Sequence, residues 1–99
     1  MEKIVVHVDA DLEDLIPGYL QNRREDVKAV WQALENQDFE TIRVLGHTMK
    51  GTGGGYGFDA ITELGQTLEE AAKNQNEPAI RQAAAALRDY LQAVEVVFQ

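Results

Sequence analysis

The sequence predicts an all-α domain, an antiparallel up-down-up-down four-helix bundle preceded by a short extended arm. Only two prolines occur in 99 residues, and the helix-favouring residues Ala, Leu, Glu and Gln are abundant. Apolar residues recur at helical spacing in four segments, and short polar turns separate these segments. With 44% apolar residues, a chain of this length can bury one core. Residues 1–99 are therefore interpreted as a single domain.

The first ten residues are predicted to form the extended arm. Residues 3 to 8 are β-branched and extended in character, with Ile4, Val6 and Val8 on one side. A lone strand has no sheet to join here, so the segment is expected to lie on the bundle as an arm. Asp9 or Asp11 is expected to cap a short helical turn, which Pro17-Gly18 interrupts.

Two helices are predicted in the first half of the chain. The first runs from about Tyr19 to Glu35, and the second from Phe39 to about Gly54, with a turn at Asn36-Gln37-Asp38 between them. Asp38 is a suitable N-cap for the second helix. The expected inward positions of these helices are Leu20, Val27, Val30, Trp31, Leu34, Ile42, Leu45, Met49, Gly53 and Tyr56.

Two further helices complete the predicted bundle. The third begins near Asp59 and continues to about Lys73, where Asn74-Gln75-Asn76 forms a polar turn. Pro78 fits the first turn of the fourth helix, which is predicted to continue to Val97 or Phe98. The expected inward positions are Ile61, Leu64, Leu68, Ala72, Ile80, Ala84, Leu87, Leu91 and Val94.

The second helix carries a histidine on the side away from its apolar stripe. At about 100° per residue, His47 lies opposite Ile42, Met49 and Gly53, so its imidazole is expected to point into solvent. Four residues share this face at the i−4, i+3, i+4 and i+7 positions. They are Arg43, Lys50, Gly51 and Gly54.

This face suits phosphoryl chemistry. An exposed neutral imidazole has a nucleophilic lone pair, and a phosphoryl group on it would bring a charge of about −2. Lys50 and Arg43 can offset that charge, while Gly51 and Gly54 leave space for the loops of a partner. The second helix places no carboxylate within one turn of His47, so a phosphoryl donor is expected to bring its own acidic groups and metal.

The motif resembles the signature of histidine-containing phosphotransfer (HPt) domains of bacterial two-component phosphorelays. It consists of His47-Thr48-Met49-Lys50-Gly51, with Gly57 six residues later. The resemblance implies a four-helix bundle in which His47 accepts the phosphoryl group, Lys50 orients and neutralises it, and Gly51 allows close approach. It also implies response-regulator receiver domains and a hybrid sensor histidine kinase as partners. Gly53 departs from the Ser or other small residue common in the family.

The resemblance implies a phosphorelay carrier that passes the group between receiver aspartates. Such a carrier is not an autonomous enzyme: it has no ATP site and no cofactor of its own, and Mg²⁺ is expected only from the receiver. The alternative of another class is a non-phosphorylated adaptor that binds receivers, which would need neither His47 nor Lys50. A small hydrolase or metal enzyme is disfavoured, because Glu13-Asp14 and Glu69-Glu70 are interpreted as solvated faces and His7 as a surface residue.

Composition excludes several other classes. A net charge of −8 disfavours nucleic acid and anionic membrane surfaces, and the absence of cysteine excludes disulfides and thiolate chemistry. The glycine run 51–57 lacks the Gly-Lys-Ser/Thr ending of a phosphate-binding loop. No signal peptide or membrane-spanning run is recognised, so a cytoplasmic location is expected, and a monomer is expected as well.

Overall fold

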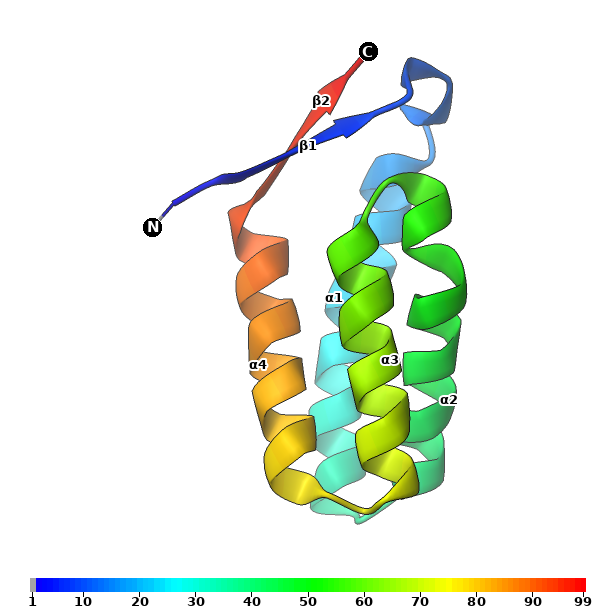
Figure 1. Cartoon of the computed structure of the whole chain (residues 1–99), viewed down its shortest axis with the longest axis vertical. Coiled ribbons are helices and arrows are strands. Elements are labelled where there is room, and N and C mark those ends of the chain that lie inside the picture. Colours follow the sequence, from blue (N-terminus) through cyan, green and yellow to red (C-terminus); the bar gives the residue numbers. More distant parts are fainter. Residues whose placement is uncertain (1) are drawn as a thin grey trace.

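The computed structural model describes residues 2–99, which form four helices and two short strands (Figure 1). The helices are α1 (Ile16–Glu35), α2 (Phe39–Thr52), α3 (Asp59–Lys73) and α4 (Glu77–Ala93). Consecutive helices run in opposite directions in Figure 1, and each contacts the next, with α4 returning to α1. The prediction of four helices is confirmed. No helix in the described part of the chain is long and apolar enough to cross a membrane.

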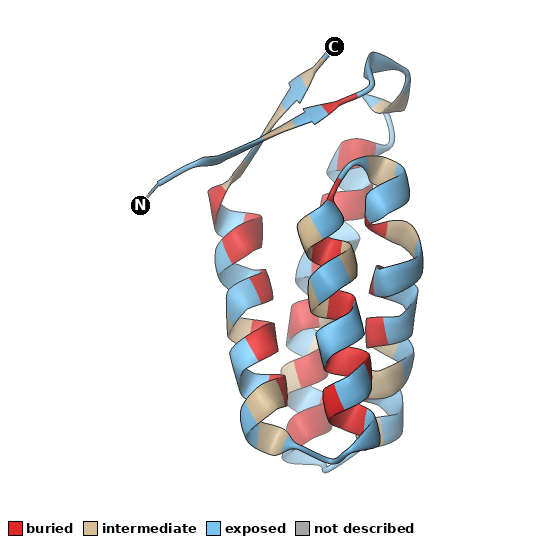
Figure 2. Ribbon diagram, viewed as in Figure 1, coloured by how far each residue is buried: buried red, intermediate tan, exposed pale blue. Residues whose placement is uncertain are grey.

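The core lies between the inward faces of the helices, where Figure 2 shows the buried residues. Apolar side chains at helical spacing fill it, as amphipathic helices require. The largest fully buried side chains include Ile42 and Met49 of α2, Ile61 and Leu68 of α3, and Phe58 before α3. Five residues expected inside are only half-buried, namely Trp31, Leu45, Tyr56, Leu64 and Val94.

Two matching turns connect the helix pairs at one end. After α1 and after α3 a glutamine adopts a left-handed conformation, Gln37 with φ 53° and Gln75 with φ 52°. In each turn the next residue caps the following helix: Asp38 accepts from the Thr41 amide, and Asn76 from the Ala79 amide. The predicted turns and the Asp38 cap are confirmed.

The prediction that the amino-terminal strand has no sheet to join is wrong. Strand β1 (Ile4–Val8) pairs in parallel with β2 (Val94–Phe98), so the whole bundle is the crossover between the two strands (Figure 1). The fourth helix accordingly ends at Ala93 and does not reach Val97 or Phe98. Residues 94–98 are mostly β-branched, and this strand propensity prevails once β1 supplies a partner.

The start of α1 also differs from the prediction. Pro17 does not interrupt a helical turn but occupies the first turn of α1, where its missing amide hydrogen has no helical partner to lose. The separate short turn, η1 (Ala10–Leu12), lies before it, and Asp9 caps this turn by accepting from the Asp11 amide at 2.9 Å.

Helices α2 and α3 approach each other closely because glycines face each other. A Cβ on Gly65 would lie 2.6 Å from the Lys50 amide nitrogen and 2.7 Å from the Gly46 carbonyl oxygen. A Cβ on Gly46 would lie 2.7 Å from the Glu69 amide nitrogen. All three distances are shorter than a Cβ tolerates, so only glycine permits this spacing. The close approach is internal to the bundle.

Replacing Gly65 by Ala is expected to destabilise the protein by about 1–3 kcal/mol, because the methyl group forces α2 and α3 apart. Urea unfolding followed by circular dichroism measures the change. Gly18→Ala is the matched control: a Cβ there meets nothing within 4 Å. It should be neutral or stabilising by up to about 1 kcal/mol. Equal stability of Gly65→Ala and the wild type would contradict the tight seam.

Candidate functional site

The candidate site lies on the seam between α2 and α3, where three charged or titratable side chains meet. His47 and Lys50 come from α2, one turn apart, and Glu69 comes from α3. The Nδ1 atom of His47 lies 2.7 Å from Oε2 of Glu69, and Nζ of Lys50 lies 3.2 Å from Oε1 of the same carboxylate. One carboxylate thus holds both side chains with its two oxygens.

The three side chains differ sharply in exposure. The His47 side chain is 69% exposed and that of Lys50 44%, whereas the Glu69 side chain is 6% exposed. The expectation that the imidazole points into solvent is therefore confirmed. The carboxylate lies beneath the two side chains, and the helix packing that buries it also fixes its position.

Electrostatics determine which ring nitrogen carries the proton. The hydrogen bond from His47 lowers the pKa of Glu69 below its ordinary 4.5, and Lys50 lowers it further, against the opposing effect of burial. Glu69 is therefore ionised at neutral pH and can only accept hydrogen bonds. Nδ1 must donate, so in the neutral ring the lone pair is on Nε2.

Glu69 is not among the residues that the sequence predicts for the site. The pair Glu69-Glu70 is predicted to lie on a solvated face, which is correct for the exposed Glu70 but wrong for Glu69. The acidic groups near His47 are likewise predicted to come from the partner. Glu69 lies 22 positions from His47 along the chain. The available signal was the spacing of Gly65 and Glu69, one turn apart on one face of α3, but its meaning depends on how α2 packs against α3.

Arg43, predicted to offset charge beside His47, is paired with a carboxylate of its own helix. Its guanidinium is engaged by Glu40 on its own helix, with Nε donating to Oε2 at 2.9 Å and a second contact from Nη2. This ion pair lowers the pKa of Glu40 and raises that of Arg43. Arg43 therefore faces Glu40 rather than standing free beside His47, and Lys50 is the cation that shares a carboxylate with the histidine.

The two predicted docking glycines have different surroundings. Gly51 lies on the exposed surface of α2, and a Cβ there would meet nothing within 4 Å. Gly54 is not on the helix face predicted for it, because α2 ends at Thr52 and Gly54 begins the short turn η2 (Gly54–Tyr56). Its amide donates to Oγ1 of Thr62 in α3 at 2.8 Å. Gly54 therefore lies just beyond the end of α2, and its part in the docking face stays a prediction.

Part of the glycine run serves the fold. A Cβ on Gly53 would lie 2.7 Å from the Thr62 amide nitrogen, so this glycine permits contact between the end of α2 and α3. Gly57 has a φ of 94° and closes η2 in the left-handed region, which favours glycine. Not all of these glycines therefore signal a partner outside the molecule.

Metal ligands do not gather in the described structure. Within residues 2–99, no group of three or more His, Asp or Glu side chains is placed to hold a metal ion. His7, the other histidine, lies in β1 and pairs in register with Val97 of β2. The seam offers one histidine, one lysine and one carboxylate, an arrangement suited to presenting a nucleophile beside a cation.

Comparison with known proteins gives one family match. Residues 14–96 match the Hpt domain family, and the match spans all four helices and the three residues of the site. No curated protein and no solved structure matches the chain.

The hydrogen bond to Glu69 predicts the tautomer of His47. In long-range ¹H–¹⁵N spectra at alkaline pH, the wild-type ring should carry its proton on Nδ1. Glu69→Ala should shift the population towards the Nε2–H form, because the acceptor is lost. Glu70→Ala, at the exposed neighbouring position, is the control and should leave the spectrum unchanged. A wild-type ring in the Nε2–H form would contradict the assignment.

Proposed function

Because the chain belongs to the Hpt domain family, we propose that it carries a phosphoryl group on Nε2 of His47. Members of the family transfer phosphoryl groups through histidine in two-component phosphorelays and interact with receiver domains and histidine kinases. The observation that carries the assignment to His47 is the short bond between its Nδ1 and the buried Glu69 carboxylate, which leaves Nε2 free in solvent.

The proposed transfer begins with an aspartyl phosphate on a receiver domain. The Nε2 lone pair of His47 forms a bond to phosphorus, the bond from phosphorus to the aspartate oxygen breaks, and the aspartate leaves as a carboxylate. The ring then bears a positive charge, since both nitrogens are substituted. Glu69 stabilises that charge through Nδ1–H, because its carboxylate is already fixed and negative.

The same arrangement supports the reverse step. When a second receiver aspartate attacks phosphorus, the bond to Nε2 breaks and the neutral Nδ1–H imidazole is the leaving group. No proton needs to enter or leave the ring in either direction. Reversible carriage between two aspartates is therefore the chemistry that the site favours, and the direction in a cell depends on which receivers are phosphorylated.

Lys50 is proposed to neutralise and orient the phosphoryl oxygens. Its ammonium is held by Glu69 beside the histidine, yet almost half of the side chain is exposed and free to turn outwards. Gly51, the next residue, leaves bare backbone where receiver loops would approach. The chain is proposed to supply no cofactor, with Mg²⁺ bound in the acidic pocket of the receiver.

Phosphorylation of His47 is testable with a receiver domain labelled by a small acyl phosphate. The wild-type chain should acquire an acid-labile, base-stable label, as expected of a phosphohistidine. His47→Gln should acquire none, and His7→Gln, which alters a histidine in β1, should be labelled normally. A label that persists in His47→Gln contradicts the proposal. Receiver binding without any label would favour the non-phosphorylated adaptor.

Loss of the cation should slow transfer without unfolding the protein. Lys50→Ala is expected to reduce the rate of phosphotransfer roughly 10- to 100-fold, because a partly exposed cation is partly screened by water. Rapid-quench kinetics measure the rate, and circular dichroism checks the fold. Lys73→Ala removes a cation from the last turn of α3 and should transfer at the wild-type rate. Unchanged kinetics in Lys50→Ala would remove Lys50 from the mechanism.

A further inference from the structure

A groove between α1 and α4 combines an apolar floor with a positive rim. It encloses about 440 Å³. Val27 and Trp31 of α1 and Leu91 of α4 form its floor, and Arg24, Lys28 and Arg88 surround them. Arg81 of α4 lies over the Trp31 ring, 6.0 Å from its centroid. The aromatic ring is half-buried and remains accessible from the groove.

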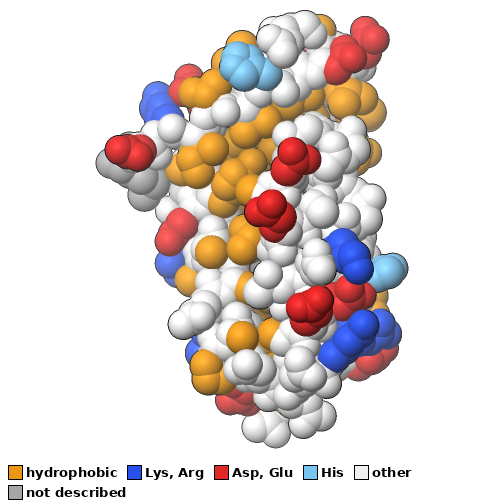
Figure 3. Space-filling model, viewed as in Figure 1, with side chains coloured by type: hydrophobic (Ala, Val, Ile, Leu, Met, Phe, Trp, Pro, Cys, Tyr) orange, Lys and Arg blue, Asp and Glu red, His pale blue; other side chains and the backbone are white. Residues whose placement is uncertain are grey.

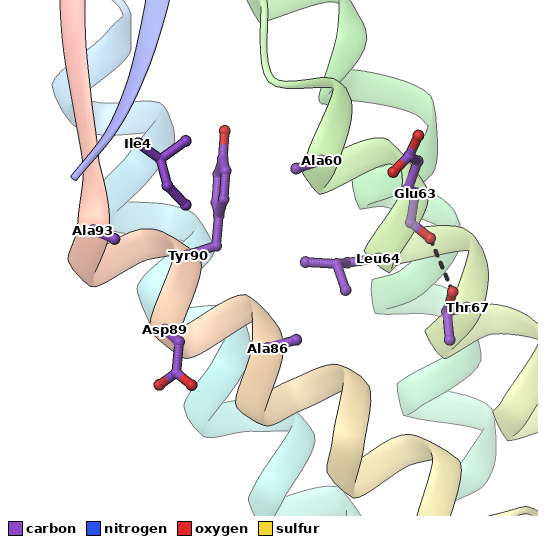
Figure 4. A pocket seen from close by; sticks show the side chains of 9 residues that line it. All are labelled: Ile4, Ala60, Glu63, Leu64, Thr67, Ala86, Asp89, Tyr90 and Ala93. Atoms are coloured by element: carbon purple, nitrogen blue, oxygen red, sulfur yellow. Dashed lines mark hydrogen bonds between the residues drawn. The ribbon is translucent and has the colours of Figure 1, made fainter. Parts of the chain in front are cut away.

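The charge of this groove is opposite to that of the chain. The protein has nine Lys and Arg against seventeen Asp and Glu, yet three of the nine cations line this one groove, and no acidic residue lines it. The groove between α3 and α4 provides a contrast. Figure 3 shows hydrophobic side chains gathered there, and Figure 4 shows Glu63 and Asp89 beside Leu64 and Tyr90. Its acidic charge has the same sign as the net charge of the protein.

The cations of the α1/α4 groove are available to a partner. Lys28 lies 3.9 Å from Glu25, and Arg88 lies 3.2 Å from Asp89. All four side chains are more than half exposed, and ion pairs of this kind contribute little to stability. An incoming carboxylate can therefore replace these contacts at small cost. Tryptophan and arginine are also the residues that most often dominate binding energy at protein interfaces.

The dimensions indicate the shape of the occupant. Arg24 and Trp31 are seven residues apart on α1, which is two helical turns or about 10 Å. Arg81 and Arg88 repeat this spacing on α4. An amphipathic helix lying between two helices places its apolar face on such a floor and its flanking side chains on the two rims.

We propose that this groove binds an acidic amphipathic helix of a partner protein. In the bundle, α1 contacts α2 and α4, and α3 contacts the same two helices, so the α1/α4 groove lies across the bundle from the α2/α3 seam. A helix bound there leaves His47 uncovered. The groove is thus a second docking surface, beyond the proposed phosphotransfer and independent of it.

Trp31 is the only tryptophan of the chain, so its fluorescence reports directly on the groove. The probe is a synthetic helical peptide of about 20 residues, long enough to be helical in water, with Leu on one face and Glu on its flanks. Titration into the full chain should shift the Trp31 emission to shorter wavelength in a saturable manner, because the ring leaves water. A peptide with Lys in place of each Glu, and a scrambled peptide that is no longer amphipathic, should give no shift.

Charge reversal in the groove provides the matched test. Arg24→Glu combined with Lys28→Glu should weaken peptide binding at least about tenfold, a loss of 1.4 kcal/mol. Lys3→Glu combined with Lys73→Glu changes the net charge equally, outside the groove, and should bind like the wild type, because distant charges are screened at physiological salt. Circular dichroism checks that both variants fold. Labelling of His47 should proceed normally with the peptide bound.

Several results would overturn the proposal. They are an unchanged Trp31 emission at saturating peptide, equal binding of the Lys or scrambled peptide, and equal loss of affinity in the two charge-reversed variants. Concentration-dependent self-association that buries Trp31 would instead make a second copy of the chain the occupant. If the Trp31 emission shifts with phosphatidylserine vesicles but not with the acidic peptide, the groove binds a membrane surface and the proposal is wrong.

Discussion

The close contact between α2 and α3 is the constraint on which the candidate site depends. Gly46 and Gly65 remove the side chains that would hold the two helices apart, and the backbone of each helix lies where a Cβ of the other would be. This spacing brings the Glu69 carboxylate within 2.7 Å of His47 and 3.2 Å of Lys50. A wider seam would leave the same three residues on the same helix faces without contact, and the histidine would be an ordinary surface side chain.

In the candidate site, a buried carboxylate holds two exposed side chains. The carboxylate is buried and hydrogen-bonded on both oxygens, while the histidine and lysine side chains above it are exposed to solvent. The proposed phosphoryl acceptor has to be accessible to another protein, yet its ring must keep one orientation and one tautomer. Placing the fixing group beneath the ring satisfies both requirements, because it leaves the outer nitrogen unobstructed.

Two features of the bundle lie outside the candidate site, namely the pair of strands and the α1/α4 groove. The parallel pairing of β1 and β2 joins the two ends of the described chain across one end of the bundle (Figure 1). The groove lies across the bundle from the seam and carries a positive rim on an acidic protein. The proposed carrier would engage more than one protein, and separate surfaces would let one partner stay bound while a second reaches the other surface.

The sequence by itself determined the number of helices, the Asp38 cap, the turns around Gln37 and Gln75, and the exposure of His47, because each depends on spacing or turn chemistry within about one turn of the chain. Tertiary structure decided the rest. Val94, Val96 and Phe98 fit the end of a helix as well as one face of a strand, and only β1 selects the strand. Likewise, Glu69 resembles any surface carboxylate until Gly65 lets α3 lie against α2. Contacts between residues distant in the chain depend on how helices pack, which local spacing does not encode.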